Sequence, residues 1–388
     1  MVLAASAVRI IKRAGKVAFA AAVIITFAGA LWTGIDAHVR GESGFAKAGG
    51  PPLLVYSEFG SDSDTIWSAR ADDPSQRTRL ATIAHAPEYG ISASLSPDGK
   101  RIAYTVLLPD AAPAIDSPAD LWVMDADGNN RKHLASDADL PVAPVWSSDS
   151  ATVVFRRSDS ATGRFQLIAA TMSGAETTLY DSTDGLLPVG FTPAGAFFFL
   201  RLSPKGSDLG VIRPDGAVDD AFAHLSDDFV RDWHLSPDGT QLSYLAARTV
   251  GETTSYGAEV LDLQAAPGAT LTASAVSTRA VDEFSPIWRP DGSGVTIGRL
   301  NAQATGAPVL QIVAPGGPPL RLLAAPSQGF DVPLSWSPDA AYLALRSYEG
   351  SSVTDPGRSW VAVAGADGTR RTVSPSSDVD VLGWAGGG

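Results

Sequence analysis

Short runs in which apolar and polar residues alternate recur along most of the chain, and sequences typical of tight turns separate them. Residues 101–106 (RIAYTV), 152–157 (TVVFRR), 241–246 (QLSYLA) and 342–347 (YLALRS) show this pattern. Each run has the length and the content of apolar and β-branched residues that favour a β-strand. Helix-forming stretches are scarce. The pattern therefore predicts an all-β protein.

A five-residue motif stands just before these runs. It reads LSPDG at 95–99 and again at 235–239, with near copies WRPDG at 288–292 and WSPDA at 336–340. Proline presets φ, aspartate bonds back to nearby backbone groups and glycine accepts a positive φ, so S-P-D-G reverses the chain tightly. Each copy therefore predicts a turn between two strands.

The motif marks a repeated unit of structure. The large residues that come before the turn, separated by 44 to 53 residues, are Leu95, Trp146, Phe191, Leu235, Trp288, Trp336 and Trp384. A second turn signal, such as Asp127-Gly128 or Asp215-Gly216, follows later in the unit, after another strand-like run. Each unit thus reads strand, turn, strand, loop, strand, turn, strand. A four-stranded antiparallel sheet repeated around an axis is a β-propeller blade.

The two ends of the repeat region complement each other. Residues 53–81 contain three strand-like runs and lack the first, whereas residues 378–384 match that first strand and are followed by no turn. Pairing the two segments would hide the sheet edges that an open array exposes. The sequence predicts a seven-bladed β-propeller of four-stranded antiparallel blades, closed by strands from both ends, over residues 53–385.

The units resemble the TolB-like propeller repeat, a WD-repeat-like family. Its signature is a Trp-Ser-Pro-Asp-Gly turn followed by a strand and a later Asp-Gly hairpin, and the resemblance covers roughly residues 53–384. It implies the propeller fold. TolB proteins carry a mixed domain before the propeller, whereas a short tether and a predicted anchor precede the blades here. Propellers of this kind also precede serine peptidase domains, but the chain contains no G-x-S-x-G motif.

The amino-terminal region predicts a membrane segment. Residues 17–35 carry no charge and as a helix would extend roughly 28 Å, close to the thickness of a bilayer core. Residues 1–16 hold four basic side chains, whereas only Arg40 and Lys47 follow the segment closely. This asymmetry predicts a single-pass protein of the cytoplasmic membrane, with a cytoplasmic basic segment and a periplasmic propeller.

A cleaved secretory signal is the alternative interpretation. Ala28-Gly29-Ala30 fits the small-x-small cleavage pattern, but the apolar run continues through Trp32 and Ile35. The continuation favours a retained signal-anchor helix, and both interpretations export the body. Residues 36–52 are expected to form a polar linker.

Charge and composition exclude several functions. After residue 16 the chain holds 25 basic and 42 acidic side chains, a balance that repels nucleic acids. There are no cysteines, which excludes disulfides, thiolate metal sites and a cysteine nucleophile. The five histidines are scattered without the spacing of metal ligands. No cofactor is predicted. Trp146, Trp288 and Trp336 are expected to pack between blades rather than to stack on a cofactor.

The long loops are predicted to lie on one face of the ring. They span residues 108–120, 248–259 and 348–359. Loops held on a rigid scaffold often carry binding residues, and aromatic and arginine side chains commonly anchor interfaces. The candidate binding residues on this face are Arg248, Tyr256, Tyr348 and Arg358.

An acidic residue also recurs in the connections between blades. The acids are Glu88, Asp139, Asp184, Asp228, Glu283, Asp331 and Asp380. In a closed ring they would converge on one mouth of the channel, where hard oxygen ligands suit calcium. The metal candidates are Glu88, Asp139, Asp228, Glu283 and Asp331. The alternative is that each carboxylate caps backbone amides of its turn.

Taken together, these features predict a non-enzymatic interaction or scaffold module, an accessory or stabilising subunit of a complex of membrane or periplasmic proteins. The alternative is a hydrolase or lyase that acts on glycans or peptides with carboxylates at the channel mouth. An enzyme of that kind needs two carboxylates at catalytic separation, one with a raised pKa.

Overall fold

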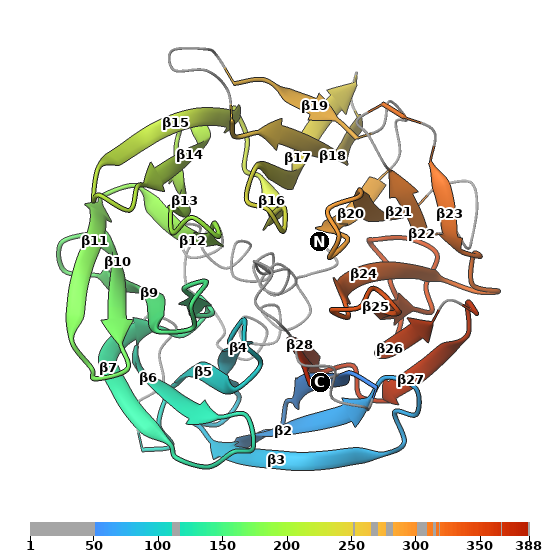
Figure 1. Cartoon of the computed structure of the whole chain (residues 1–388), viewed down its shortest axis with the longest axis horizontal. Coiled ribbons are helices and arrows are strands. Elements are labelled where there is room, and N and C mark those ends of the chain that lie inside the picture. Colours follow the sequence, from blue (N-terminus) through green and yellow to red (C-terminus); the bar gives the residue numbers. More distant parts are fainter. Residues whose placement is uncertain are drawn as a thin grey trace.

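The protein is a ring of β-sheets around a central axis (Figure 1). The computed structural model describes residues 51–110, 117–250, 253–264, 271–276, 282–300, 309–312, 316–317, 319–365 and 367–386. All regular structure within these ranges is β-strand, and the strands form seven four-stranded antiparallel sheets. The predicted segments 1–16 and 17–35 lie outside the described residues. Nothing in the described ranges is a helix of sufficient length and hydropathy to span a membrane.

Six of these sheets are blades built from consecutive strands, and the first strand of each lies nearest the axis (Figure 1). Three of them follow the amino-terminal strands: β4 (Ser92–Leu95), β5 (Arg101–Val106), β6 (Pro118–Asp125) and β7 (Lys132–Asp139); β8 (Val145–Trp146), β9 (Thr152–Asp159), β10 (Arg164–Thr171) and β11 (Glu176–Ser182); β12 (Gly185–Phe191), β13 (Phe197–Ser203), β14 (Gly206–Ile212) and β15 (Val218–Ser226). The other three are β16 (Arg231–Leu235), β17 (Gln241–Val250), β18 (Thr253–Asp262) and β19 (Ala273–Ala275); β20 (Asp282–Trp288), β21 (Val295–Leu300), β22 (Val309–Ile312) and β23 (Leu320–Leu323); β24 (Phe330–Trp336), β25 (Tyr342–Tyr348), β26 (Ser359–Gly365) and β27 (Arg370–Ser374).

The closing blade combines both ends of the described chain. It consists of β28 (Val379–Ala385), β1 (Leu53–Glu58), β2 (Ser63–Arg70) and β3 (Arg77–Ala84), in that order. In the pairing of β28 with β1, which we call the closing seam, Leu54 stands opposite Trp384 and Ser57 opposite Asp380. The predicted all-β propeller, with antiparallel four-stranded blades closed by amino- and carboxy-terminal strands, is confirmed.

The repeated motif forms the turn between the innermost and the second strand. The Ser96 hydroxyl donates to the Asp98 carboxylate (2.6 Å), and the Gly99 amide donates to the Ser96 carbonyl (2.8 Å). Gly99 has a φ of 69°, a region that favours glycine. Ala340 adopts a φ of 56° at the corresponding site, so the turn geometry persists where glycine is replaced. The motif is thus a structural device, as its sequence predicts.

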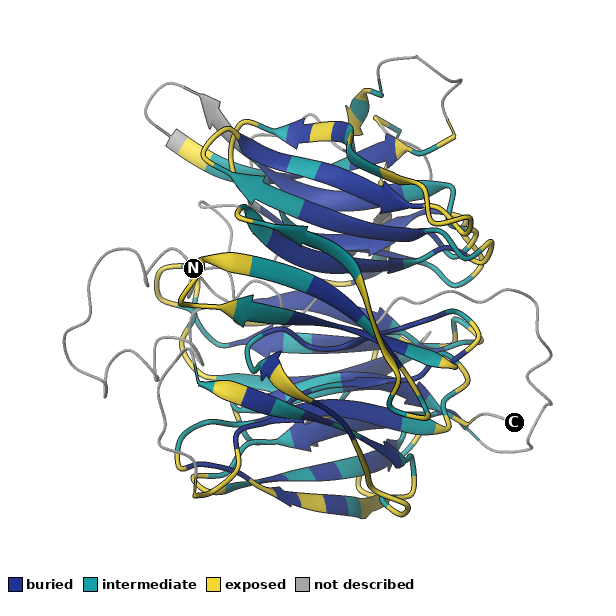
Figure 2. Ribbon diagram, turned by 90° about the vertical axis from the view of Figure 1, so that its left-hand side faces the viewer, coloured by how far each residue is buried: buried dark blue, intermediate teal, exposed yellow. Residues whose placement is uncertain are grey.

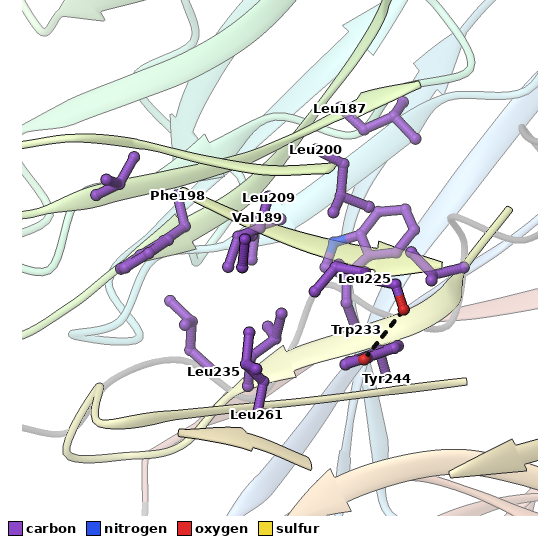
Figure 3. Close-up of a cluster of buried hydrophobic side chains, with 14 of the residues drawn as sticks. Leu187, Val189, Phe198, Leu200, Leu209, Leu225, Trp233, Leu235, Tyr244 and Leu261 are labelled. Carbon is purple, nitrogen blue, oxygen red and sulfur yellow. Dashed lines mark hydrogen bonds between the residues drawn. The ribbon is translucent and has the colours of Figure 1, made fainter. Parts of the chain in front are cut away.

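Apolar side chains fill the space between neighbouring blades. One cluster joins β12–β15 to β16–β18 and includes Leu187, Phe198, Trp233 and Leu235 (Figure 3). The hydroxyl of Tyr244 donates to the Leu225 carbonyl (3.4 Å) within it. Across the ring, buried residues concentrate in the strands and exposed residues in the loops and outer edges (Figure 2). Burial of apolar surface between blades therefore accounts for much of the cohesion of the ring.

The recurrent tryptophans tie four of the blades to the blade before them. The indole of Trp146 donates to the Ser94 carbonyl (3.3 Å), and that of Trp288 donates to the His234 carbonyl (3.1 Å). The indoles of Trp336 and Trp384 donate to hydroxyl groups of the preceding blade, those of Thr296 (2.9 Å) and Ser335 (3.0 Å). The expectation that these side chains pack between blades is confirmed for the described structure.

Candidate functional site

The loops predicted over 348–359 and 248–259 follow the second strands of their blades, at the ends opposite the S-P-D-G turns, but the second of them is not a loop. Of the loop predicted over 108–120, residues 111–116 lie outside the described residues, and residues 118–120 belong to β6. Residues 248–250 and 253–259 belong to β17 and β18, and Val250 pairs with Thr253. The prediction of a loop over 248–259 was wrong because β-branched residues and a tyrosine continue the extended ladder there. Only two residues at the tip of this hairpin, 251–252, lie outside the described strands.

Backbone hydrogen bonds join the two ends of the loop between β25 and β26. The Glu349 amide donates to the Arg358 carbonyl (2.9 Å), and the Gly350 amide donates to the Pro356 carbonyl (2.7 Å). The Arg358 guanidinium also donates to the Glu349 carboxylate (2.6 Å) while its side chain stays 70% exposed. Arg358 is therefore a surface residue, as predicted, on an internally braced loop.

Tyr256 is half-buried on β18. The guanidinium of Arg231, on the innermost strand β16, lies 3.3 Å from the centroid of its ring. Such a cation–π contact holds both side chains in place. Arg248 lies on β17 opposite Ser255, and its side chain is outside the described structure.

Tyr348 does not reach the surface, and its assignment as an exposed anchor was wrong. Its ring is 6% exposed and stacks on Phe330 at 4.8 Å, and Phe330 stacks in turn on Phe284 at 5.5 Å. Tyr348 is the last residue of β25, a strand that is buried on both faces, and its ring enters the contact between the blades of β20–β23 and β24–β27. Burial raises the pKa of its hydroxyl above the usual value.

The recurrent acids occupy three different positions in the repeat. Asp380 lies four residues before Trp384, inside the innermost strand β28, and Asp139 lies seven residues before Trp146, at the end of β7. Glu283 and Asp331 lie five residues before the large residue of the turn, inside the innermost strands β20 and β24, and both are fully buried. Glu88, Asp184 and Asp228 lie seven residues before it, in the connections between blades, and are partly or fully exposed. The acids therefore do not form one ring of equivalent carboxylates.

Two buried acids of the innermost strands, Glu283 and Asp331, are neutralised by arginine. Arg299 on β21 donates to Glu283 (2.7 Å), whose other oxygen accepts the Ala258 amide (2.8 Å). Asp331 accepts Arg370 (2.8 Å) and the hydroxyl of Ser347 (2.6 Å). These pairs stabilise contacts within and between neighbouring strands, and they occupy the carboxylate oxygens that a cation would need.

Asp139 is paired in the same way. It accepts the Arg156 guanidinium and, through its other oxygen, the Ser158 hydroxyl. Asp228 instead accepts the amide of Phe229 (2.8 Å), as the turn-capping interpretation expects. Among the described residues no group of three or more histidine, cysteine or acidic side chains is arranged to hold a metal ion. At Asp139, Glu283 and Asp331, arginines supply the positive charge.

Sequence analysis missed these arginines. Arg156, Arg201, Arg299 and Arg346 are each the fifth residue of the second strand of their blade, in β9, β13, β21 and β25. Arg156 also donates to the Leu186 carbonyl of the next blade (3.2 Å). The signal was present as an arginine ten or eleven residues after the large residue of the turn. It shows only when the repeats are aligned on the strand that follows the turn.

A buried pair of an aspartate and a histidine joins β2 of the closing blade to the connection that follows β3. The Asp64 carboxylate contacts the Nε2 atom of His85 (3.1 Å) and accepts the Ile91 amide (2.9 Å), and Nδ1 of the same ring contacts the Ala86 carbonyl (2.8 Å). Burial lowers the pKa of His85, but the bond to Asp64 and the contact with the carbonyl outweigh it and raise the pKa above the usual value. Both ring nitrogens are thus engaged in structural contacts.

Comparison with known proteins agrees with this fold. No family model matches the chain. The Tol-Pal system protein TolB of Anaeromyxobacter dehalogenans (strain 2CP-1) is 35% identical over 97 residues, which are 25% of this chain and 19% of that protein. Dipeptidyl-peptidase 5 of Porphyromonas gingivalis is 25% identical over 304 residues, 75% of this chain and 42% of that protein. The chain thus matches less than half of the length of either relative.

Solved propellers share the architecture at low identity. A prolyl endopeptidase superposes with a TM-score of 0.59 at 14% identity, over 98% of this chain and 55% of that one. The propeller domain of the Trilobed protease from Pyrococcus furiosus, described as having an open velcro topology, gives 0.56 at 13% identity over 84% and 96%. An oligogalacturonate lyase in complex with manganese gives 0.53 at 10% identity over 84% and 85%.

These similarities define the class of the protein. It is a β-propeller with TolB-like repeats, and its sequence similarity to TolB proteins extends over part of the chain. In contrast to an open ring, its first and last described strands share one sheet.

Proposed function

We propose that the protein is a non-enzymatic interaction module, held at the outer face of the cytoplasmic membrane by residues 17–35, and an accessory or stabilising subunit of an envelope complex. The observation that carries the proposal is the use of charge in the ring. Glu283 and Asp331 are neutralised inside the blades, whereas Arg358 is exposed on a braced loop of the long-loop face. The long-loop face therefore offers an exposed side chain in a fixed position to a partner protein. The buried acids Glu283 and Asp331 are paired with arginines and do not form a pair of catalytic carboxylates.

The partner is proposed to be a membrane or periplasmic protein. Tyr256 and Arg231 present a preorganised aromatic and cationic pair beside the channel mouth, and such pairs lose little conformational entropy on binding. The name of the TolB relative places that protein in the Tol-Pal system. A role in an envelope assembly for the present chain is a proposal by analogy.

The test is recovery of partners with the full-length chain in mild detergent from its native membrane, with identification of the proteins that co-purify. Arg358→Glu and Tyr256→Ala on the long-loop face should each lower recovery at least about tenfold, the effect of losing one interface anchor. Arg70→Glu is the matched control, since Arg70 forms a similar exposed pair with Asp72 near the turns of the other face. Equal recovery with all three variants would contradict docking through the long-loop face.

A hydrolase or lyase remains the second candidate, because Asp380 on the innermost strand β28 has a raised pKa. Burial of the carboxyl raises its pKa to about 8, with Arg346 opposing and Asp64 and Asp378 adding to the shift. A carboxyl that keeps its proton near neutral pH can act as a general acid. Screening glycans and peptides with the wild-type protein and with Asp380→Asn tests this candidate, and turnover that this substitution abolishes would favour it over the interaction module.

A further inference from the structure

The ring of His85 is held between two oxygen atoms in the interior of the protein. Its Nδ1 atom lies 2.8 Å from the Ala86 carbonyl, and its Nε2 atom lies 3.1 Å from the Asp64 carboxylate. The side chain of His85 is 0% exposed. A neutral imidazole has one N–H donor, whereas a carbonyl or a carboxylate can only accept. Both contacts are hydrogen bonds only if both ring nitrogens carry a proton, so the geometry indicates an imidazolium.

Asp64, the acid that faces the ring, also accepts two backbone amides. One of its oxygens accepts the Gly60 amide (3.2 Å), and the other accepts the Ile91 amide (2.9 Å). Hydrogen bonds from amides to a carboxylate are charge-assisted and stabilise its ionised form. The histidine and the aspartate therefore form a buried ion pair in which further hydrogen bonds satisfy the carboxylate, the condition under which two charges are tolerated in a protein interior.

The charged groups that act on the histidine are acidic. Asp64 of β2 and Asp62 of the loop between β1 and β2 act on the ring directly. Asp380 of β28 interacts electrostatically with Asp64, and Glu88 lies three residues beyond His85 in the chain. Burial lowers the pKa of His85, but its two hydrogen bonds and the charges of Asp64 and Asp62 raise the pKa above the usual value. A positively charged ring suits these surroundings.

The pair lies where the chain passes from the closing blade to the next blade. His85 follows β3 directly, and residues 85–91 connect β3 to β4. The Ala86 amide donates to the Leu107 carbonyl, just beyond β5 of the next blade (2.8 Å). The connection of residues 85–91 is thus bound to both blades, and the histidine lies at its start.

This connection packs directly on the buried pair. A Cβ atom added to Gly90 would lie 2.7 Å from the ring of Phe59 and 3.0 Å from the Asp64 carboxylate, so a side chain does not fit there. Phe59 in turn stacks on the imidazole of His85, with 5.7 Å between the ring centroids. The position of the connection therefore depends on the aspartate and the histidine beneath it.

We propose that His85 is a buried imidazolium that fastens residues 85–91 to β2 and to the loop before β2, and that loss of its proton releases this connection. A neutral ring keeps one N–H donor, so one of its nitrogens would present a lone pair to an acceptor oxygen. Water does not reach the buried ring while the connection is closed, and an uncompensated buried polar group is costly. Opening of the connection relieves that cost. The fastening is a pH-sensitive device at the long-loop face of the closing blade.

The direction of the pH dependence follows from the raised pKa of His85. In the unfolded chain a histidine titrates at about 6.5, and a ring exposed by opening should behave in the same way. The stabilisation from the pair is fully present below about pH 6.5 and is lost as the pH rises through the raised pKa. Within this range the equilibrium constant for opening should rise by up to about tenfold per pH unit.

NMR of the full-length chain with nitrogen-15-labelled histidine tests the protonation directly, because the chemical shift of each ring nitrogen reports whether it carries a proton. His85→Gln identifies the signals by their loss. In the folded chain both nitrogens of His85 should be protonated at about pH 6, and their titration midpoint should lie above that of the histidines in the chain unfolded with urea. A folded midpoint at or below the unfolded one would overturn the proposal.

Hydrogen–deuterium exchange of the full-length chain tests the release of the connection. After correction for the intrinsic pH dependence of exchange, amides of residues 85–91 should open more readily at pH 8 than at pH 6.5, by up to about tenfold per pH unit. Residues 140–144, which connect β7 to β8, contain no histidine and should change much less. Asp64→Asn should abolish the extra pH dependence, because the new amide group can donate to a neutral ring.

His224→Gln is the matched control, since His224 also contacts two carboxylates, those of Asp208 and Asp227, but is half-exposed. This variant should keep the wild-type pH dependence at residues 85–91. Equal pH dependence in the two connections of the wild-type chain would overturn the proposal, and so would an Asp64→Asn variant that folds and keeps the wild-type profile. None of these results depends on partner recovery, so the fastening can fail while the proposed interaction module stands.

Discussion

The closing blade and the blade of β24–β27 reach the same geometry by different routes. In the blade of β24–β27 the innermost strand and the second strand are consecutive, whereas the closing blade joins β28 to β1 from the two ends of the propeller. Both innermost strands carry a bulge two residues before their tryptophan, at Leu334 and at Leu382. Both bulged residues are buried. The repeat therefore specifies the local shape of a strand even where no turn connects it to its neighbour.

What differs is the way in which charge is compensated. Asp331 on β24 is buried and accepts both an arginine and a hydroxyl, whereas Asp380 on β28 forms a longer ion pair with Arg346 (3.8 Å) and its side chain is 22% exposed. A seam without a covalent turn also loses more conformational entropy when it closes, because the closing contact joins residues far apart in sequence. We therefore expect the closing blade to be the weakest place in the ring, although its bulge has the same position as that of the other blade.

The largest effect should follow from removing β28. Truncation after Asp378 exposes the edge of β1 and deletes the buried Trp384, Leu382 and Val379. We expect loss of the single cooperative unfolding transition and aggregation through the exposed edge. Circular dichroism on heating and size-exclusion chromatography measure both. Removal of residues 387–388 alone is the control, and a truncated chain that unfolds like wild type would refute the closure as described.

The second-largest effect should follow from breaking the buried ion pair between Glu283 and Arg299, in a blade made of consecutive strands. Glu283→Ala leaves Arg299 buried without its partner, and loss of one member of such a pair costs about 3–5 kcal/mol of unfolding free energy. Urea titration measures it. On the seam, Asp380→Ala should cost far less, because its ion pair with Arg346 is longer and partly exposed, and it should stabilise the chain at pH 9, above the raised pKa of Asp380. Equal losses of unfolding free energy in the two variants would contradict the idea that the two blades compensate their buried charge differently.

A smaller change is expected at the tryptophans that join the blades. Trp384→Phe and Trp288→Phe each remove one indole hydrogen bond, to Ser335 and to the His234 carbonyl, and should cost about 1 kcal/mol. Similar values from chemical denaturation would indicate that side-chain contacts at the seam equal those elsewhere. A cost above about 3 kcal/mol at Trp384 alone, in the range of a lost core side chain, would place the difference in packing instead of charge.

The smallest effect should come from the surface. Arg358→Ala breaks an exposed pair with Glu349 and should change the unfolding free energy by less than about 1 kcal/mol, as is usual for such pairs. Its effect on partner recovery should be much larger than its effect on stability. Thermal unfolding of the variant therefore also controls for misfolding in the recovery experiment. A large fall in melting temperature would contradict a purely superficial role.

Much of the fold could be predicted because recognisable turn sequences mark the strand boundaries in each repeat. The S-P-D-G turns, the alternating runs and the unmatched strand at 378–384 together predicted the blades and their closure. The site was predicted less well. Arg358 was placed correctly on the surface, but Tyr348 was taken as exposed and the acids as a single ring. These errors share one cause: the repeat alignment shows which blade a residue belongs to and not which side chain of the next blade it meets.

The sequence by itself therefore determined the architecture of this protein, because turn chemistry and strand alternation are local and are repeated in every unit. Tertiary structure alone decided which acids are paired. Glu283 and Asp331 meet arginines, whereas Asp380 meets one that is already committed to backbone carbonyls. Such pairings join residues that are distant in sequence, and the electrostatic cost of each carboxylate depends on burial and on neighbours that only the assembled ring brings together.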